Sequence, residues 1–275
     1  MSIERIRRVL LALDDARPDV NVLRALQSLL DLDALEMTGL FLEDEELLRA
    51  ALLPCFREIS YSGVAAPLDR DRLLRDMALQ ARAAEEAFRA LAEHLTREHW
   101  RLAHRFLVAR GRFAEELDRA AAEAEFVLVT RRARGAGLRQ RLGHTFANLV
   151  RQPRHVLFVN EPWASGSSVV VVNAGRTALD HAARIAETQG LRLVVANPVA
   201  VPPPAAARLP RDAVVRQLTA LDEQAIADLC LREDARLLVL PELPDFDWAE
   251  LLLSLTDRLP CSILKLAEPA APPPA

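Results

Sequence analysis

The sequence is poor in the residues that hold small secreted domains or metal centres together. It has three cysteines in 275 residues, Cys55, Cys230 and Cys261, with no CxxC pair and no zinc-like cysteine–histidine spacing. An odd number of widely separated cysteines argues against a disulfide framework and against a zinc site. Each cysteine is therefore expected to be a small buried apolar side chain.

Long apolar runs and excess positive charge are also missing. The first apolar run, Val9–Leu13, is closed by Asp14–Asp15. It is too short for the core of a signal peptide and far shorter than the roughly 18 residues of a membrane span. We therefore expect a cytoplasmic protein with no membrane partner. The net charge is −4 and Lys265 is the only lysine, which gives no electrostatic reason to expect nucleic-acid binding.

Along the sequence, short apolar runs alternate with stretches in which apolar residues recur at helical intervals of three and four positions. A continuous apolar run of strand length is typical of a buried parallel strand. The predicted strands are 9–13, 35–42, 101–108, 126–130 and 155–159, with a break at Gly111, and the predicted helices are 20–30, 69–99 and 113–123. This alternation predicts an α/β fold, a mostly parallel, doubly wound sheet with helices on both faces.

The pattern then begins again after a Pro/Gly/Ser-rich segment at 161–168. It predicts further strands at 169–172, 191–196 and 236–240, and helices at 177–189 and 222–232. Both copies end in Glu-Pro, at 161–162 and 268–269. The implied domains are residues 1–162 and 168–268, followed by a disordered Pro/Ala tail at 269–275.

The two copies differ in length. Their first strands are 160 residues apart and their closing Glu-Pro pairs 107, so the second copy has lost about 53 residues. The second copy lacks a counterpart of the long helix 69–99, and the segment Pro198–Pro210 takes its place. It also lacks a counterpart of the Gly/Arg-rich loop at 131–143. The apolar stripe of the long helix suits packing on the sheet; docking of a partner helix is the alternative.

The chain resembles two universal stress protein domains in tandem. In that family the first strand ends in an aspartate that contacts adenine, and Asp14 takes this position. A later loop, Gly-x2-Gly-x9-Gly-Ser/Thr, wraps the nucleotide phosphates, and Thr130–His144 aligns with it without a gap. The first two glycines are replaced by Thr130 and Ala133, the third is Gly143, and His144 stands at the Ser/Thr position.

The resemblance implies a Rossmann-like domain of the adenine nucleotide alpha hydrolase type in each half. Since the family forms dimers through its last strand, the resemblance also implies that the segments 155–159 and 262–266 lie in contact, as an intramolecular version of that dimer. In the first half it implies a degenerate site for ATP or a similar adenine nucleotide. The residues carried over to that site are Asp14, Arg131, Gly135, Gly137, Gly143, His144 and Thr145. In the second half Asn173 replaces the aspartate and the loop is absent, so no nucleotide is expected there. The alternative for the Gly/Arg loop is a solvated arginine-rich segment that pairs with acids elsewhere.

Two functions from different classes follow from this resemblance. One is a stress-response binding or adaptor protein, with a protein partner or a second copy of itself and with no catalytic residue. The other is a nucleotide-dependent enzyme of the adenine nucleotide alpha hydrolase group, whose Ser-Gly-Gly-x-Asp-Ser and His-x-Gly-His motifs are absent here. An electron-transfer flavoprotein is a third possibility, for which we find no flavin signature. The histidines show no metal-ligand spacing, so no metal is expected.

Phosphoryl transfer requires positioned charged groups around the phosphates, and the sequence places no general base in a recognisable phosphate motif. We therefore expect no ATP hydrolysis by the purified chain above a buffer control. The assay is phosphate release from ATP, with Asp14→Ala measured in parallel. Turnover that disappears in Asp14→Ala would place the protein among the enzymes of the group.

Overall fold

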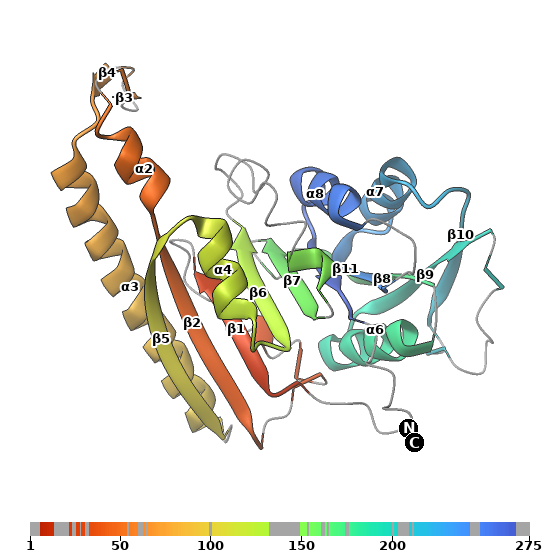
Figure 1. Cartoon of the computed structure of the whole chain (residues 1–275). Helices are drawn as coiled ribbons and strands as arrows, with labels where there is room; N and C mark the ends of the chain where they lie inside the picture. Colours follow the sequence, from red (N-terminus) through yellow and green to blue (C-terminus); the bar gives the residue numbers. More distant parts are fainter. Residues whose placement is uncertain are drawn as a thin grey trace, which may run out of the picture.

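The computed structural model describes residues 6–13, 22–23, 26–27, 29–30, 33–53, 55–59, 63, 65–98, 101–131, 149–152, 154–160, 163, 165–173, 176–199, 201–202, 209–210, 212–242 and 248–267. Ten strands form one sheet through the whole molecule, in the order β10-β9-β8-β11-β12-β7-β6-β1-β2-β5 (Figure 1). Within these described ranges, no helix is long and apolar enough to cross a lipid bilayer.

The two halves of the chain contribute five strands each, in the same order. The first half supplies β1 (Arg8–Leu13), β2 (Leu35–Asp44), β5 (Leu102–Gly111), β6 (Phe126–Arg131) and β7 (His155–Asn160). The second half supplies β8 (Ser168–Val172), β9 (Arg192–Pro198), β10 (Val214–Leu218), β11 (Ala235–Leu240) and β12 (Ser262–Lys265). In each half the first strand lies at the centre, with the second and third on one side and the fourth and fifth on the other. All pairs within a half are parallel, as predicted.

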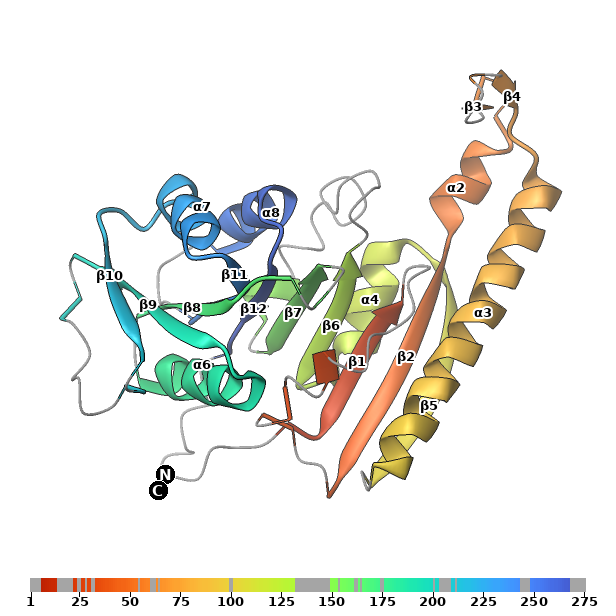
Figure 2. The same ribbon diagram turned by 180° about the vertical axis from the view of Figure 1, so that it is seen from behind.

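Helices cover both faces of the sheet. On one face lie α3 (Arg70–Arg97) and α6 (Arg176–Gln189), and on the other α4 (Phe113–Ala121), α7 (Glu223–Arg232) and α8 (Trp248–Arg258) (Figures 1 and 2). The central strands are therefore buried on both sides, which is why their apolar runs are continuous rather than alternating. In Val169–Val172 every side chain is fully buried.

The long helix α3 packs on β2 and β5, as its apolar stripe predicted. Its side chains Met77, Ala81, Ala84, Phe88, Leu91, Ala92 and Leu95 are buried. Asp69 caps its first turn, where the carboxylate accepts hydrogen bonds from the backbone N–H groups of Asp71 and Arg72. A Cβ at Gly39 of β2 would lie 2.8 Å from the rings of Phe88 and Phe106, so glycine allows the close approach of helix and strand.

The halves are joined by antiparallel pairing of their last strands, β7 and β12. Ile263 pairs with Phe158, Leu264 with Leu157 and Lys265 with Val156. The backbone N–H of Asn160 donates to Ser262 Oγ at 3.0 Å, and the Asn160 side chain donates to the carbonyl of Pro260. The prediction that these two segments lie in contact is confirmed. A two-fold axis perpendicular to the sheet produces this arrangement, in which each helix layer stays on its own face.

Two titratable side chains lie beside this seam. The ring of His155 stacks near Phe126, with ring centres 6.4 Å apart, and meets the ring of His181 from α6 edge-on at 6.5 Å. Its Nδ1 accepts a hydrogen bond from the backbone N–H of Ala267 at 3.3 Å. Burial, followed by the neighbouring His181 and Lys265, lowers the pKa of His155 from 6.5 to about 4. The fold therefore holds this imidazole neutral at physiological pH.

Several elements depart from the sequence predictions. The strand β5 includes Gly111 as its last residue rather than breaking before it. Helix α2 (Glu45–Ala50), the hairpin β3–β4 (Arg57–Ile59 and Ala65–Pro67), strand β10 and helix α8 were not predicted. Of the predicted helix 20–30, only Val22–Leu23 is helical among the described residues. Cys230 and Cys261 are buried as expected, but Cys55 is exposed, because it lies in the turn beyond α2.

The lowered pKa of His155 makes stability depend on pH. Between pH 6.5 and about 4 the unfolded chain binds a proton that the folded chain does not, so stability falls as pH falls through this window. For the native chain we expect a loss of up to about 2 kcal/mol between about pH 7 and pH 5 from this group. Denaturant unfolding at both pH values should show that the free energy of unfolding of His155→Phe falls less between about pH 7 and pH 5 than that of the native chain. The control is His104→Phe, at an exposed histidine, which should lose as much stability between the two pH values as the native chain does. An equal loss in all three proteins would contradict the assignment of this pH dependence to His155.

Candidate functional site

The centre of the first half is a topological switch point. The strand β1 pairs with β2 on one side and with β6 on the other, both in parallel. Since Ala12 lies opposite Val129, the chain leaves β1 and β6 at the same, carboxyl edge of the sheet. Ligands of open α/β sheets bind in the crevice outside such an edge. The topology thus brings the end of the first strand and the start of the Gly/Arg loop together, as the resemblance requires.

The predicted nucleotide residues themselves fall almost entirely outside the described part of the chain. Arg131 is the last residue of β6, where its backbone pairs with Asn160 of β7. Those that lie outside the described residues are Asp14, Gly135, Gly137, Gly143, His144 and Thr145. Strand β6 fixes where the loop begins, whereas every contact within the loop remains a prediction from the sequence.

Charged side chains beside this crevice are joined in ion pairs. At the carboxyl ends of β2 and β5, Arg110 binds Glu43 with N–O distances of 2.6 and 2.7 Å, and Glu43 is buried. The next arginine, Arg112, lies 3.6 Å from Glu46 and 3.4 Å from Glu115. Glu43 of β2 therefore neutralises Arg110 of β5, and Arg112 lies beside acids of α2 and α4. Both arginines are engaged with acids rather than open to an anion.

The second half has an equivalent switch point, where β8 pairs with β11 and β9. Asn173, directly after β8, is buried, and so is Asn197 near the end of β9. The Asn173 side-chain amide donates to Asn197 Oδ1 at 2.6 Å and to the carbonyl of Pro202 at 3.3 Å. The Asn197 amide donates to the carbonyls of Pro198 and Val201 at 3.2 and 2.9 Å.

This amide pair closes the strand end with the protein's own loop. Both side-chain NH₂ groups bond to oxygen atoms of the chain, so neither is available to a ligand. The loop that follows β9 supplies two of the four acceptors, the carbonyls of Val201 and Pro202, and it stands where the first half has its long helix. Asn197 was missed by the sequence reasoning, although its position at the end of an apolar strand, matching that of Asn173, was a signal for it.

A second pair missed from the sequence is Lys265 with Glu242. Lys265 is completely buried, and its Nζ donates to Glu242 Oε2 at 2.7 Å and to the carbonyl of Gln152 at 3.3 Å. Burial lowers the pKa of Lys265 and the bond to Glu242 opposes that change. Since Gln152 precedes β7 and Glu242 follows β11, the only lysine ties the two halves together through these two bonds.

No group of three or more histidine, cysteine, aspartate and glutamate side chains with the geometry of a metal site occurs in the described ranges. His155 and His181 meet each other across the seam, and burial lowers the pKa of both. Two neutral imidazoles on a hydrophobic cluster fill space between the halves.

The closed second-half crevice gives a direct test. Asn173→Asp installs the residue that the resemblance assigns to adenine binding, but it replaces an amide donor by a carboxylate facing Asn197 Oδ1. We expect no ATP binding to be gained and a loss of about 1–3 kcal/mol in stability, because the buried Asn197 Oδ1 and the carbonyl of Pro202 lose their donor. Calorimetric ATP titration and denaturant unfolding measure the two effects. The exposed amide-to-acid change Gln217→Glu is the control and should stay within about 0.5 kcal/mol of the native chain; new ATP binding in Asn173→Asp would refute the closure.

Comparison with known proteins gives structural relatives only. No protein-family model matches the sequence, and no curated protein matches it. A universal stress protein from Archaeoglobus fulgidus is similar over 97% of this chain and 98% of its own, with 14% identity and a TM-score of 0.59.

Two structures from Pseudomonas aeruginosa are similar as well. A putative universal stress protein matches with 14% identity and a TM-score of 0.51, over 95% of this chain and 93% of its own. A protein of unknown function matches with 14% identity and a TM-score of 0.50, over 95% and 92%. Identities this low establish the architecture and not the activity. Over nearly its whole length, the chain therefore has the α/β fold of solved universal stress protein structures.

Proposed function

We propose that the protein is a stress-response binding or adaptor protein of the universal stress protein type. Its first half binds ATP weakly or not at all, its second half binds no nucleotide, and it has no catalytic turnover. The halves, residues 1–162 and 168–268, are two copies of one domain. The observation that carries the proposal is the Asn173–Asn197 pair, since a strand end bonded to its own loop is a scaffold and not a ligand pocket.

The first half supports weak binding by the chemistry of its loop. A phosphate loop needs backbone that turns with positive φ and approaches oxygen atoms closely, which favours glycine. Thr130 and Ala133 replace two of the three motif glycines. Thr130 lies within β6, where its backbone is extended and does not form the turn of a phosphate loop. At Ala133 a Cβ costs about 1–2 kcal/mol in a left-handed conformation, which corresponds to roughly a tenfold loss of affinity.

Opposing this, the loop sequence is rich in arginine. Arg131, Arg132, Arg134, Arg139 and Arg141 occur in the loop with no acid between them. Arginine forms charge-assisted hydrogen bonds with phosphate, and salt screens this attraction when the charges are exposed. Any ATP affinity that remains should therefore depend on salt, whereas an adaptor surface would use the same loop to contact acidic side chains of a partner.

The test is calorimetric titration with ATP at low and high salt, on the native chain and on Gly143→Val. We expect weak binding at low salt that fades at high salt and is lost in Gly143→Val, or no binding at all. Gly175→Val, a glycine substitution in the second half, which has no counterpart of the loop, is the control and should leave any binding unchanged. Tight, salt-insensitive binding would contradict the degenerate loop, and weak binding that survives Gly143→Val would locate the ligand elsewhere. Mass spectrometry of small molecules released from the purified protein checks for a ligand other than ATP.

A further inference from the structure

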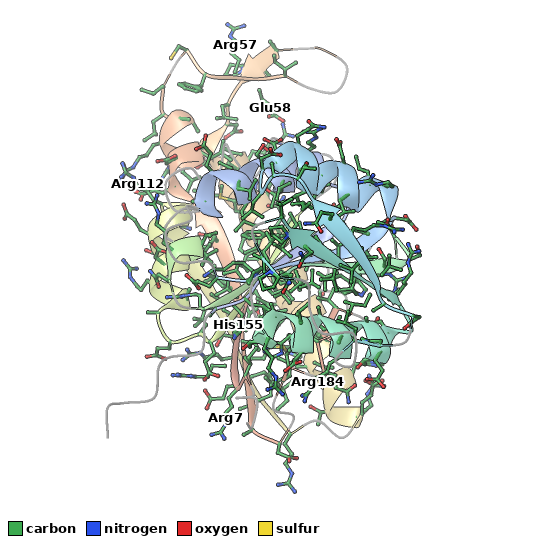
Figure 3. All side chains as sticks on the ribbon, turned by 90° about the vertical axis from the view of Figure 1, so that its right-hand side faces the viewer. Arg7, Arg57, Glu58, Arg112, His155 and Arg184 are labelled. Atoms are coloured by element: carbon green, nitrogen blue, oxygen red, sulfur yellow. The ribbon has the colours of Figure 1, made fainter. Side chains whose placement is uncertain are left out.

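One part of the first half projects beyond the sheet and its helix layers. It consists of residues 45–76, which include α2, the hairpin β3–β4 and the first turns of α3, and we refer to it as the arm. In Figures 1 and 2 the arm extends past the carboxyl ends of β2 and β5, and in Figure 3 the labelled Arg57 and Glu58 mark its tip above the rest of the molecule. The second half has no such extension among its described residues, where β9 and β10 are joined without a helix.

The arm exposes large apolar side chains. Leu52 is 65% exposed, Leu53 51%, Phe56 48% and Ile59 73%, and we call these four side chains the arm patch. They lie within eight consecutive positions of the chain. Among the described residues, four of the eight most exposed large hydrophobic side chains thereby lie on one projection. Large exposed apolar patches, especially those with a polar rim, typically mark interaction sites.

The hairpin β3–β4, which carries Ile59 of the arm patch, has little support of its own. Each of its two strands has three residues. Five of these six residues are exposed, and Glu58 is half-buried. A two-stranded hairpin in water is marginally stable at best. It is fixed to α3 by Arg72, which lies 3.4 Å from Glu58 and 3.7 Å from Asp76. The arm is thus held in a defined orientation while its apolar side chains face away from the sheet's core.

The charges of the arm select among possible partners. Residues 45–76 contain six acidic and five basic side chains, so the arm is nearly neutral. Part of this charge is paired internally, in Arg49–Glu45 at 2.8 Å and in the Arg72 pairs. A near-neutral apolar surface has no field to attract nucleic acid, an anionic membrane or a strongly charged protein. A self-complementary contact needs this neutrality, because a two-fold interface sets the same surface against itself and any net charge would repel.

The size of the arm also suits a contact with a second copy of this chain. A standard protein–protein interface takes about 20–30 residues from each partner, and the arm has 32 residues. Such interfaces combine an apolar centre with a polar, charged rim. The arm patch supplies the centre, and the arginines and acids of α2 and the start of α3 supply the rim.

We propose that the arm is a homodimerisation surface, where two copies of this chain pack arm to arm with Leu52, Leu53, Phe56 and Ile59 at the centre. The contact leaves the β7–β12 seam inside each chain and lies at the opposite end of the first half from it. It also brings the exposed Cys55 of one chain near that of the other, since Cys55 lies between the four residues in sequence. Cys230 and Cys261 are buried, so Cys55 is the one thiol that reports on the contact.

The experiment is size-exclusion chromatography with light scattering on the full chain, in reducing buffer and over a wide range of concentrations. The native chain should be a dimer, and the double variant Phe56→Ser, Ile59→Ser should raise the dimer dissociation constant by at least about tenfold. The matched control is Val215→Ser, an exposed β10 residue at the far end of the sheet, which should dimerise as the native chain does. Circular dichroism shows that each variant is folded.

A thiol cross-link gives a second readout that does not depend on truncating the patch. A short bismaleimide should link native chains in pairs at dilute concentration, and Cys55→Ser should abolish the link without abolishing the dimer. A native chain that stays monomeric at every concentration would overturn the proposal, whatever other partner the arm then captures. A dimer that persists undiminished in the double variant, with no link through Cys55, would equally overturn it and place the dimer contact elsewhere.

Discussion

The antiparallel pairing of β7 with β12 is the contact on which the rest of the architecture depends. Each half alone would expose its fifth strand as a sheet edge, and an open edge is a template for uncontrolled pairing. By pairing the two edges with each other, the chain forms one ten-stranded sheet. The two-fold relation keeps each helix layer on its own face, so both hydrophobic clusters extend through both halves. Leu157 and Leu264, opposite each other at the seam, belong to the same cluster as Leu128 and Leu237 of the neighbouring strands.

That seam also explains two polar side chains that would otherwise be out of place in a core. Lys265 is buried completely, yet its ammonium group meets a carboxylate from one half and a backbone carbonyl from the other. A buried charge is tolerated when it is paired and hydrogen-bonded. His155 solves the same problem by remaining neutral, packed between Phe126 of its own half and His181 of the other. Both residues make the association of the halves specific as well as close.

The repeated topology creates two crevices, and the two halves treat them differently. In the second half the crevice is closed by the Asn173–Asn197 pair and the short loop after β9. In the first half the corresponding crossover is long, and it builds α3 and the arm instead. The loss of the long crossover therefore has two consequences at once: it lets a loop fold down over the strand ends, and it leaves the projecting surface on one half only.

The repeated pattern predicted two similar halves, which share one strand order, and the resemblance predicted the pairing of their last strands. The sequence alone determined the class of fold and the position of most strands. It could do so because strands buried on both faces must be continuously apolar, a signal carried by each segment by itself. Strand β10 was not predicted, because Val214–Leu218 is an edge strand with three exposed residues, one of them charged. Helix α8 was missed as well. The amide pair of Asn173 and Asn197, the Lys265–Glu242 bridge and the projection of the arm were decided only by tertiary structure. Each of them joins residues from separate elements, and no pattern within one segment encodes which distant group will satisfy a buried polar atom or leave an apolar one uncovered.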